Sequence, residues 1–203
     1  MKATISFRLY VLLVAAFMII YSSGCATSKI PIYIDQQLPQ KNIDSIVLLP
    51  VVDARKDKSF ETNLDQKIRT PIRKILEKKG YSVITPDKFS KENHQVTPEE
   101  IIEMDVAELS TLDPSDAKVL LIVYVEDVSD AYMVLAHTFK IEASAVLIDK
   151  INHSLLWKDK AVGVSGQGGL MSGLFIGMNR WEAISFCIGN LFSSFPEKAA
   201  NKK

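Results

Sequence analysis

The sequence predicts an α/β (α+β) fold, a mixed sheet of about five strands with helices packed on it. Three apolar runs predict strands: "SIVLLPVVD" at 45–53, "YSVI" at 81–84 and "KVLLIVYVEDV" at 118–128. The first and third are nearly continuous in Val, Ile and Leu, which is typical of strands buried on both faces. Helix-periodic segments separate the three runs, and an alternating strand, a hairpin partner and a last helix follow them.

The first helix is predicted by apolar residues at three- and four-residue spacing. These are Leu64, Ile68, Ile72, Ile75 and Leu76. Pro71 interrupts the pattern, so we expect the helix to restart or kink there with Thr70 as cap. Gly80 after "EKK" is expected to end the helix in the left-handed conformation. Pro50, inside the first apolar run, indicates an edge position, a bulge or a strand end.

The second helix has a start signal of its own. Thr97 and Glu100 have the spacing of a capping box, and Pro98 stands at the first helical position. We expect one helix through "EEIIEMDVAEL" at 99–109.

The second half of the chain alternates between apolar and polar residues. From 133 to 147 the odd positions are apolar apart from His137, and the even positions from 138 to 144 are polar, which predicts a strand with one solvated face. A turn at 149–154 leads into the partner strand "LLWKDKAVGV". The last helix is predicted by a stripe of apolar residues, which are Trp181, Ile184, Ile188, Leu191 and Phe195.

The N-terminus has the pattern of a secretory signal with a cysteine at the cleavage point. Lys2 and Arg8 precede an uncharged apolar stretch at 9–21, and Ser22 to Gly24 lead to Cys25. This resembles the bacterial lipobox, although Ser22 stands where leucine is preferred, and a plain cleaved signal remains the alternative. We therefore predict a lipoprotein signal peptide at 1–24 and acylation of Cys25. Ala26, in place of an aspartate, favours the outer membrane.

The predicted mature chain divides into three parts. Residues 25–43 form a lipidated tether, 44–197 a periplasmic α/β domain, and 198–203 a disordered tail. The tether segment "IPIYI" at 30–34 is apolar enough to dock on the domain. Without Lys2 and Arg8 the chain has 22 basic residues against 24 acidic ones, so its charge gives no indication of nucleic-acid binding. With Cys25 acylated, Cys187 has no disulfide partner and is expected to be a buried thiol.

Several of these segments occur together in a consistent order. They are "SIVLLPVVDARKD", "LEKKGYSVI", "KVLLIVYVED", "VLIDKINHSLLWK" and a glycine-rich run before a final helix. In combination they resemble a family of small Gram-negative lipoproteins of unknown function that includes a vaccine-candidate surface antigen. The resemblance implies a fold similar to the amino-terminal domain of TolB and the core of the curli secretion lipoprotein CsgG. The family hairpin usually has Thr-Gly at its turn, so here the positive φ must fall on Asn152 or His153.

No residue pattern in the chain indicates catalysis. The three histidines are isolated in the sequence, and no cysteine cluster could hold zinc, so we expect no catalytic residues, no metal and no cofactor. The loop after the first strand contains Asp53, Arg55 and Asp57, where open α/β sheets often bind ligands. These residues either contact a partner or form a solvated loop.

The sequence therefore favours a non-enzymatic outer-membrane lipoprotein whose periplasmic domain binds envelope proteins, with a second copy of itself among the candidates. Envelope assembly or export is the role that the resemblance implies. The alternatives are a CsgG-like oligomeric secretion component and a small-ligand carrier. The predicted partner surface combines the glycine segment with the start of the last helix: Gly169, Gly173, Leu174, Phe175, Gly177, Ser185 and Gly189. An irregular connector is the other interpretation of this segment. Charged residues at Leu174 and Phe175 should abolish association without unfolding the domain.

Overall fold

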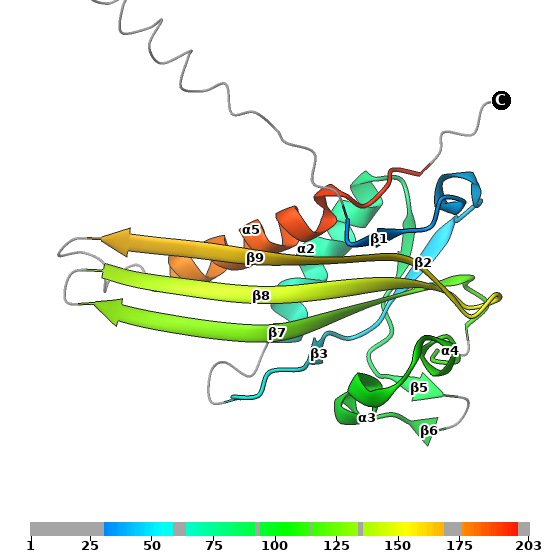
Figure 1. The fold of residues 1–203 in the computed structure, drawn as a ribbon, viewed down its shortest axis with the longest axis horizontal. Helices are drawn as coiled ribbons and strands as arrows, with labels where there is room; N and C mark the ends of the chain where they lie inside the picture. The colour runs from blue at the N-terminus through cyan, green and yellow to red at the C-terminus, as the bar shows by residue number, and fades with distance from the viewer. Residues whose placement is uncertain are drawn as a thin grey trace, which may run out of the picture.

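The computed structural model describes residues 31–58, 64–91, 94–113, 115–133, 136–168 and 176–198. Within these ranges the centre is a seven-stranded mixed sheet of spatial order β1-β9-β8-β7-β2-β4, with β3 also paired to β7 (Figure 1). Its strands are β1 (Tyr33–Ile34), β2 (Ser45–Leu48), β3 (Val52–Asp53), β4 (Ser82–Ile84), β7 (Val119–Met133), β8 (Ala136–Asp149) and β9 (Ser154–Gly168). The predicted fold class is confirmed, and the strands beyond the expected five are the two-residue β1 and β3.

The first apolar run forms two strands rather than one. β2 lies parallel to both β4 and β7, and it ends before Pro50. After the proline, β3 continues beside the same neighbour, with Val52 opposite Tyr124 on β7. Pro50 therefore marks a strand end, one of the three outcomes that the sequence predicted.

Helix α2 (Leu64–Lys78) is continuous through Pro71, so the predicted restart at Thr70 is wrong. Four residues at helical spacing (Leu64, Ile68, Ile72, Leu76) are buried in the core, and this packing outweighs the hydrogen bond that the proline lacks. The predicted cap is confirmed, since Gly80 has φ 94°. The N–H groups of Gly80 and Tyr81 donate to the carbonyls of Glu77 and Leu76, the two bonds of a Schellman motif.

The single helix expected at 99–109 is in fact two. Thr97 caps α3 (Pro98–Glu103) with the predicted capping box, and the backbone becomes extended at Met104. Asp105 then forms a second capping box with Glu108 and starts α4 (Val106–Leu109). The second cap satisfies N–H groups that a continuous helix would have bonded within itself. The described chain also contains η1 (Leu38–Gln40) and a small hairpin of β5 (Ser90–Lys91) and β6 (His94–Gln95).

The alternation predicted for the second half is confirmed on β8. Phe139, Ile141, Ala143, Ala145 and Leu147 are buried, and the polar residues between them face the other side. The positive φ at the β8–β9 turn falls on His153, at 51°.

Strand β9 runs further than expected, through the beginning of the glycine-rich segment to Gly168. At Gly163 the strand passes very close to the last helix, since a Cβ there would lie 2.0 Å from the carbonyl oxygen of Ala183. The strand can pass this close beneath the last helix, α5 (Ile176–Ser193), only without a side chain.

The buried stripe of α5 differs from the prediction at one residue. Trp181 is 50% exposed, whereas Ile184, Ile188 and Leu191 are buried, together with Ala183, Cys187 and Phe192. Phe195 is also buried, but it follows the end of the helix at Ser193. Trp181 lies at the margin of the stripe, where the helix surface turns away from the sheet. The buried state of Cys187 is confirmed.

Helices cover the two faces of the sheet unequally (Figure 1). α2 and α5 pack on one face and form the larger core with the inward residues of β7, β8 and β9. α3 and α4 cover a smaller core on the other face, at the end where β2 lies. The three long strands extend beyond that second cover, so their far halves have a helix only on the α5 side among the described elements.

Part of the predicted tether is bound to the domain. β1 pairs antiparallel with β9, and Leu38 and Ile43 are buried in the core. At the other end, Lys198 donates its backbone N–H to Lys79 and forms an ion pair with Asp44. Cys25 and residues 199–203 lie outside the described ranges. In the part of the chain that is described, no helix is long and apolar enough to cross a membrane.

Candidate functional site

The described residues contain no group of three or more His, Cys, Asp or Glu side chains arranged to hold a metal ion. The histidines lie far apart in the fold. His94 is exposed on β6, and His153 hydrogen-bonds to Ser110 beside α4. His137 is the hydrogen-bonded core histidine that the strand pattern favoured, because its Nε2 contacts Asp130 and its side chain is buried.

The His137–Asp130 pair belongs to a network that ties α5 to the sheet. Arg180 of α5 lies 3.0 Å from the second Asp130 oxygen, and its guanidinium stands 5.8 Å from the Phe139 ring centre. Glu182, two residues after Arg180 on the same helix, accepts a hydrogen bond from Ser165 of β9. The buried Asp130 carboxylate has a cationic partner in Arg180, the arrangement that permits a charge to be buried, whereas Glu182 is exposed and bonds to a hydroxyl. The network explains the docking of the helix without any ligand.

Asp53, the last residue of β3, forms an ion pair with Arg55 in the loop that follows. The guanidinium donates from Nε and Nη2 to the two Asp53 oxygens, at 2.7 and 2.8 Å. The hydrogen bond from Arg55 lowers the pKa of Asp53 despite partial burial. Arg55 is buried, whereas Asp57 is exposed, so only the outer part of the loop is solvated. A ligand contact by these three residues stays a prediction.

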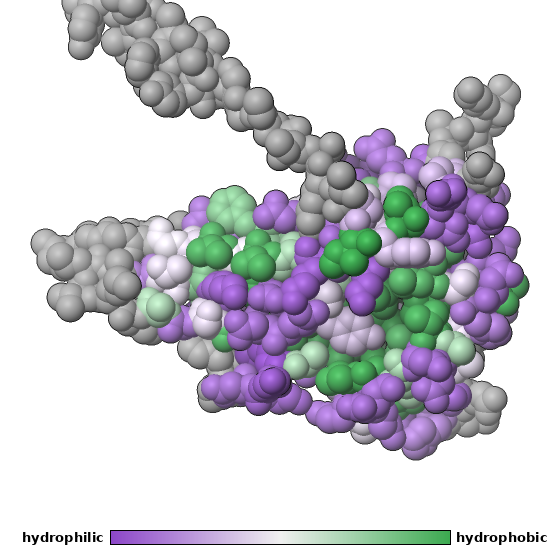
Figure 2. Space-filling model, in the orientation of Figure 1, coloured by the Kyte–Doolittle hydropathy of each residue, from purple (hydrophilic) through white to green (hydrophobic). Residues whose placement is uncertain are grey.

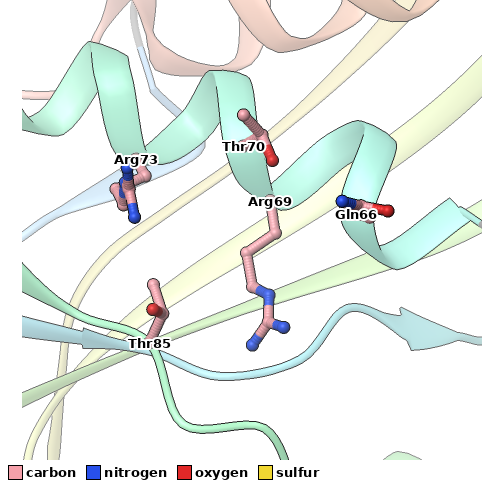
Figure 3. Close-up of a pocket in the computed structure, with 5 residues that line it drawn as sticks. All are labelled: Gln66, Arg69, Thr70, Arg73 and Thr85. Atoms are coloured by element: carbon pink, nitrogen blue, oxygen red, sulfur yellow. The ribbon is translucent and has the colours of Figure 1, made fainter.

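An open pocket of about 190 Å³ lies between α2 and the end of β4 (Figure 3). Its lining residues are Gln66, Arg69, Thr70, Arg73 and Thr85. Arg69 donates to the Pro86 carbonyl and pairs with Asp65 at 3.0 Å, and Arg73 pairs with Glu77 at 3.4 Å. Guanidinium and hydroxyl groups suit a small anion, but both arginines already face carboxylates of their own helix. The sequence analysis missed this pocket, although the four-residue spacing of the two arginines on α2 could have indicated it.

Among the side chains that the structure describes on α5 and β9, four large apolar ones are exposed near the outer margin of β9. Trp181 and Phe186 on α5 are each 50% exposed, and Val162 and Val164 on the opposite face of β9 are 40% and 52% exposed. Figure 2 shows hydrophobic side chains gathered over β9 and the neighbouring part of α5, surrounded by hydrophilic ones.

We call this region the α5–β9 surface. It consists of Val162, Val164, Trp181, Ser185, Phe186 and Gly189. Trp181, Ser185 and Gly189 follow one another at four-residue steps and therefore form a single row on the helix. A Cβ at Gly189 would meet nothing within 4 Å, so another chain could approach the helix closely there.

The structure describes only some of the predicted partner-surface residues. Ser185 and Gly189 are exposed on α5 as expected, and the backbone of Gly177 lies in the first turn of that helix, not in a connector. Gly169, Gly173, Leu174 and Phe175 lie outside the described ranges. Sequence reasoning missed Phe186, Val162 and Val164, although apolar side chains at solvated positions of a helix and an alternating strand were the available signal.

The comparison with protein families places this small α+β domain among lipoproteins. Residues 36–199 match the family model described as "Putative lipoprotein GNA1162-like". The chain therefore belongs to the GNA1162-like lipoprotein family, which confirms the resemblance found in the sequence. Family membership indicates attachment to a membrane and names no catalytic activity. No curated protein matches the chain.

Solved structures with a similar fold include other lipoproteins. Lipoprotein GNA1162 from Neisseria meningitidis is 22% identical, with a TM-score of 0.48 over 66% of this chain and 91% of its own. The PelC dodecamer from Paraburkholderia phytofirmans is 15% identical, with a TM-score of 0.46 over 77% of this chain and 91% of its own. A minor lipoprotein from Acinetobacter baumannii is 7% identical, with a TM-score of 0.40 over 77% and 97%.

Proposed function

We propose that the chain is a lipoprotein of the outer membrane, anchored through acylated Cys25, whose periplasmic domain binds other envelope proteins and performs no catalysis. The observation that carries the partner-binding part is the α5–β9 surface, with two half-exposed aromatic side chains beside a row of small residues. Aromatic side chains are enriched at the centres of protein interfaces because they bury large apolar areas on binding. Assembly or export of envelope components is the role that we infer.

The anchor is supported by the signal pattern and by membership of a lipoprotein family. Replacing Cys25 with alanine should release a soluble form or leave an uncleaved precursor. Fractionation of cells that express each form would measure this. Processed Cys25→Ala protein that still fractionates with the outer membrane would show that the anchor is wrong.

The partner surface can be tested by chemical crosslinking in intact cells, followed by mass spectrometry of the captured proteins. We expect Phe186→Gln and Trp181→Gln to reduce capture of envelope proteins, because each removes an exposed aromatic contact while leaving the buried stripe intact. Lys74→Gln, at an exposed position of α2, is the matched control and should leave capture unchanged. Equal capture by all three variants would place the binding surface elsewhere.

The two alternatives have their own signatures. A CsgG-like secretion component predicts ring-shaped oligomers in detergent, and a small-ligand carrier predicts a small molecule that co-purifies with the protein. The open pocket beside Arg69 and Arg73 is the place to look for that molecule.

A further inference from the structure

Within the described residues, the outer edge of β9 is paired with another strand only at its beginning. β1 contributes two pairs, Ile34 opposite Trp157 and Tyr33 opposite Lys158, and Asp35 N–H donates to the Leu156 carbonyl at 2.8 Å. Among the described strands none pairs with that edge further along, although β9 continues to Gly168 (Figure 1). Alternate residues of a strand direct their backbone groups to the same edge. The backbone N–H and C=O groups of Val162, Val164 and Gly166 therefore point to the same outer edge as the carbonyl of Leu156.

A proline explains why the chain's own tether stops pairing. In the register of β1, the residues whose N–H groups point toward β9 are Asp35, Tyr33 and then residue 31. That residue is Pro31, which has no N–H to donate. Pro31 therefore contributes no N–H to β9 at that position, and in the described part of the chain the edge from Val162 onward pairs with no other strand.

The edge of β9 also lacks the features that usually prevent strands from pairing. Residues 162–168 read "VGVSGQG", with no charge and no proline. The opposite margin of the long strands is different, since β7 carries the accessible Glu126 and Asp127 and has a register shift between Val125 and Asp127. Charge and irregularity discourage pairing at the β7 margin, whereas the β9 margin is a template for it.

We propose that two copies of this chain pair β9 with β9 in antiparallel orientation about Gly163, so that the two sheets become one. This inference rests on the proposed function and names one partner, a second copy. The sequence around Gly163 is self-complementary. A twofold axis at Gly163 places Val162 of each copy opposite Val164 of the other, and it brings no two side chains of like charge opposite each other. Gly163 itself brings no side chain to the centre.

The last helix adds a second contact to this dimer. Glu182 reaches Ser165 of β9, and Phe186 follows it by four residues on the same side of α5. Phe186 therefore lies on the side of the helix that faces the open edge. A twofold axis normal to the sheet keeps both α5 helices on one face, where the two exposed Phe186 rings become buried between them. Anchoring of both copies in one membrane raises their effective concentration.

The test is the association of the full lipoprotein in detergent, measured by sedimentation at several concentrations. We expect a monomer–dimer equilibrium. Val164→Pro should weaken it by roughly 10- to 100-fold, since it removes one outward N–H from each copy and two intermolecular hydrogen bonds of about 1 kcal/mol each. The fold should persist, because that N–H is not directed toward β8. Val164→Thr keeps the N–H and the β-branched shape, so it is the matched control and should leave the dissociation constant unchanged.

Val164→Lys covers the case in which the proline variant fails to fold. Val164 is 52% exposed, so lysine is accommodated in the monomer, but it opposes pairing and should give monomers. A mixture of Val162→Cys and Val164→Cys chains should form a disulfide between copies under mild oxidation. A chain that stays monomeric, or a dimer unaffected by both Val164→Pro and Val164→Lys, would overturn the proposal. Capture of envelope proteins through Phe186 by a strictly monomeric chain would preserve the proposed function while rejecting this dimer.

Discussion

Gly163 shows how one residue sets the distance between a helix and a strand. A Cβ at this position would lie 2.0 Å from the Ala183 oxygen and 2.6 Å from the Cys187 nitrogen, both backbone atoms that cannot move aside. The sequence places this glycine in the predicted partner strand "LLWKDKAVGV" without indicating a role for it. Its role depends on a helix that begins 13 residues later, and no local pattern reports such a contact.

Gly163→Ala should therefore lower the free energy of unfolding by about 2 kcal/mol or more, because either α5 or β9 must shift. The matched variant is Gly189→Ala, exposed on α5 with open space around it. That change should raise stability by about 0.5–1 kcal/mol, since alanine restricts the unfolded chain and favours helix. Urea unfolding measures both. Equal effects of the two substitutions would contradict the close packing at Gly163.

A second single-residue effect concerns pH. Burial disfavours the charged form of Asp149, but hydrogen bonds from Lys41, Asn152 and the N–H of Ile151 outweigh it and lower the pKa to about 2. A lowered carboxyl pKa stabilises the fold above the ordinary value of 3.8, and this stabilisation is lost as pH falls from about 4 toward 2.

We expect the free energy of unfolding to fall by roughly 2 kcal/mol across that pH window because of Asp149. Asp149→Asn should be less stable at pH 7 and should lose this part of the acid dependence. Unfolding curves at pH 7, 4 and 2.5 provide the measurement. A parallel decline in the wild-type and variant proteins would show that another group is responsible.

Within an element, the result depends on which local signals compete. The Thr97 capping box and the Gly80 cap are complete in the sequence, and both are confirmed. The break at Met104 was also encoded, by Asp105 and Glu108, but a continuous apolar pattern concealed it. At Pro71 the sequence predicted a break that does not occur, because core packing keeps α2 continuous through the proline.

The placement of α5 depends on a charged network that sequence periodicity does not contain. Asp130→Ala should destabilise the protein by about 3 kcal/mol, because it leaves His137 buried without its carboxylate and removes the Asp130 contact of Arg180. Asp127→Ala, three residues earlier and about half exposed, removes only a 3.7 Å contact with Lys140. Its effect should stay within about 0.5 kcal/mol. Thermal or urea unfolding of the two variants measures the difference. A similar loss of unfolding free energy in both would mean that the network contributes little.

At the scale of the whole molecule, the order of the predicted elements was enough to predict the fold class, but it did not predict the α5–β9 surface. The succession of strands and helices along the chain emerges from apolar periodicity, because burial of apolar side chains drives it. The α5–β9 surface depends on which side of α5 the sheet occupies, and this is decided by Gly163, Arg180 and Glu182 at long range. Ser185 and Gly189 could be predicted as a small-residue face because their spacing is local. Phe186 was missed although its place off the apolar stripe was a local signal, whereas the edge of β9 that no described strand pairs with depends on strand pairing that no local pattern reports.

The central claim is that the domain acts through protein contacts at the α5–β9 surface. The most direct test places a photo-crosslinking amino acid at Phe186 in intact cells, and at Lys74 on α2 as the control. We predict discrete crosslinked protein species from position 186 that are absent from position 74. An absence of crosslinked protein at position 186, or the same species from both positions, would contradict the claim.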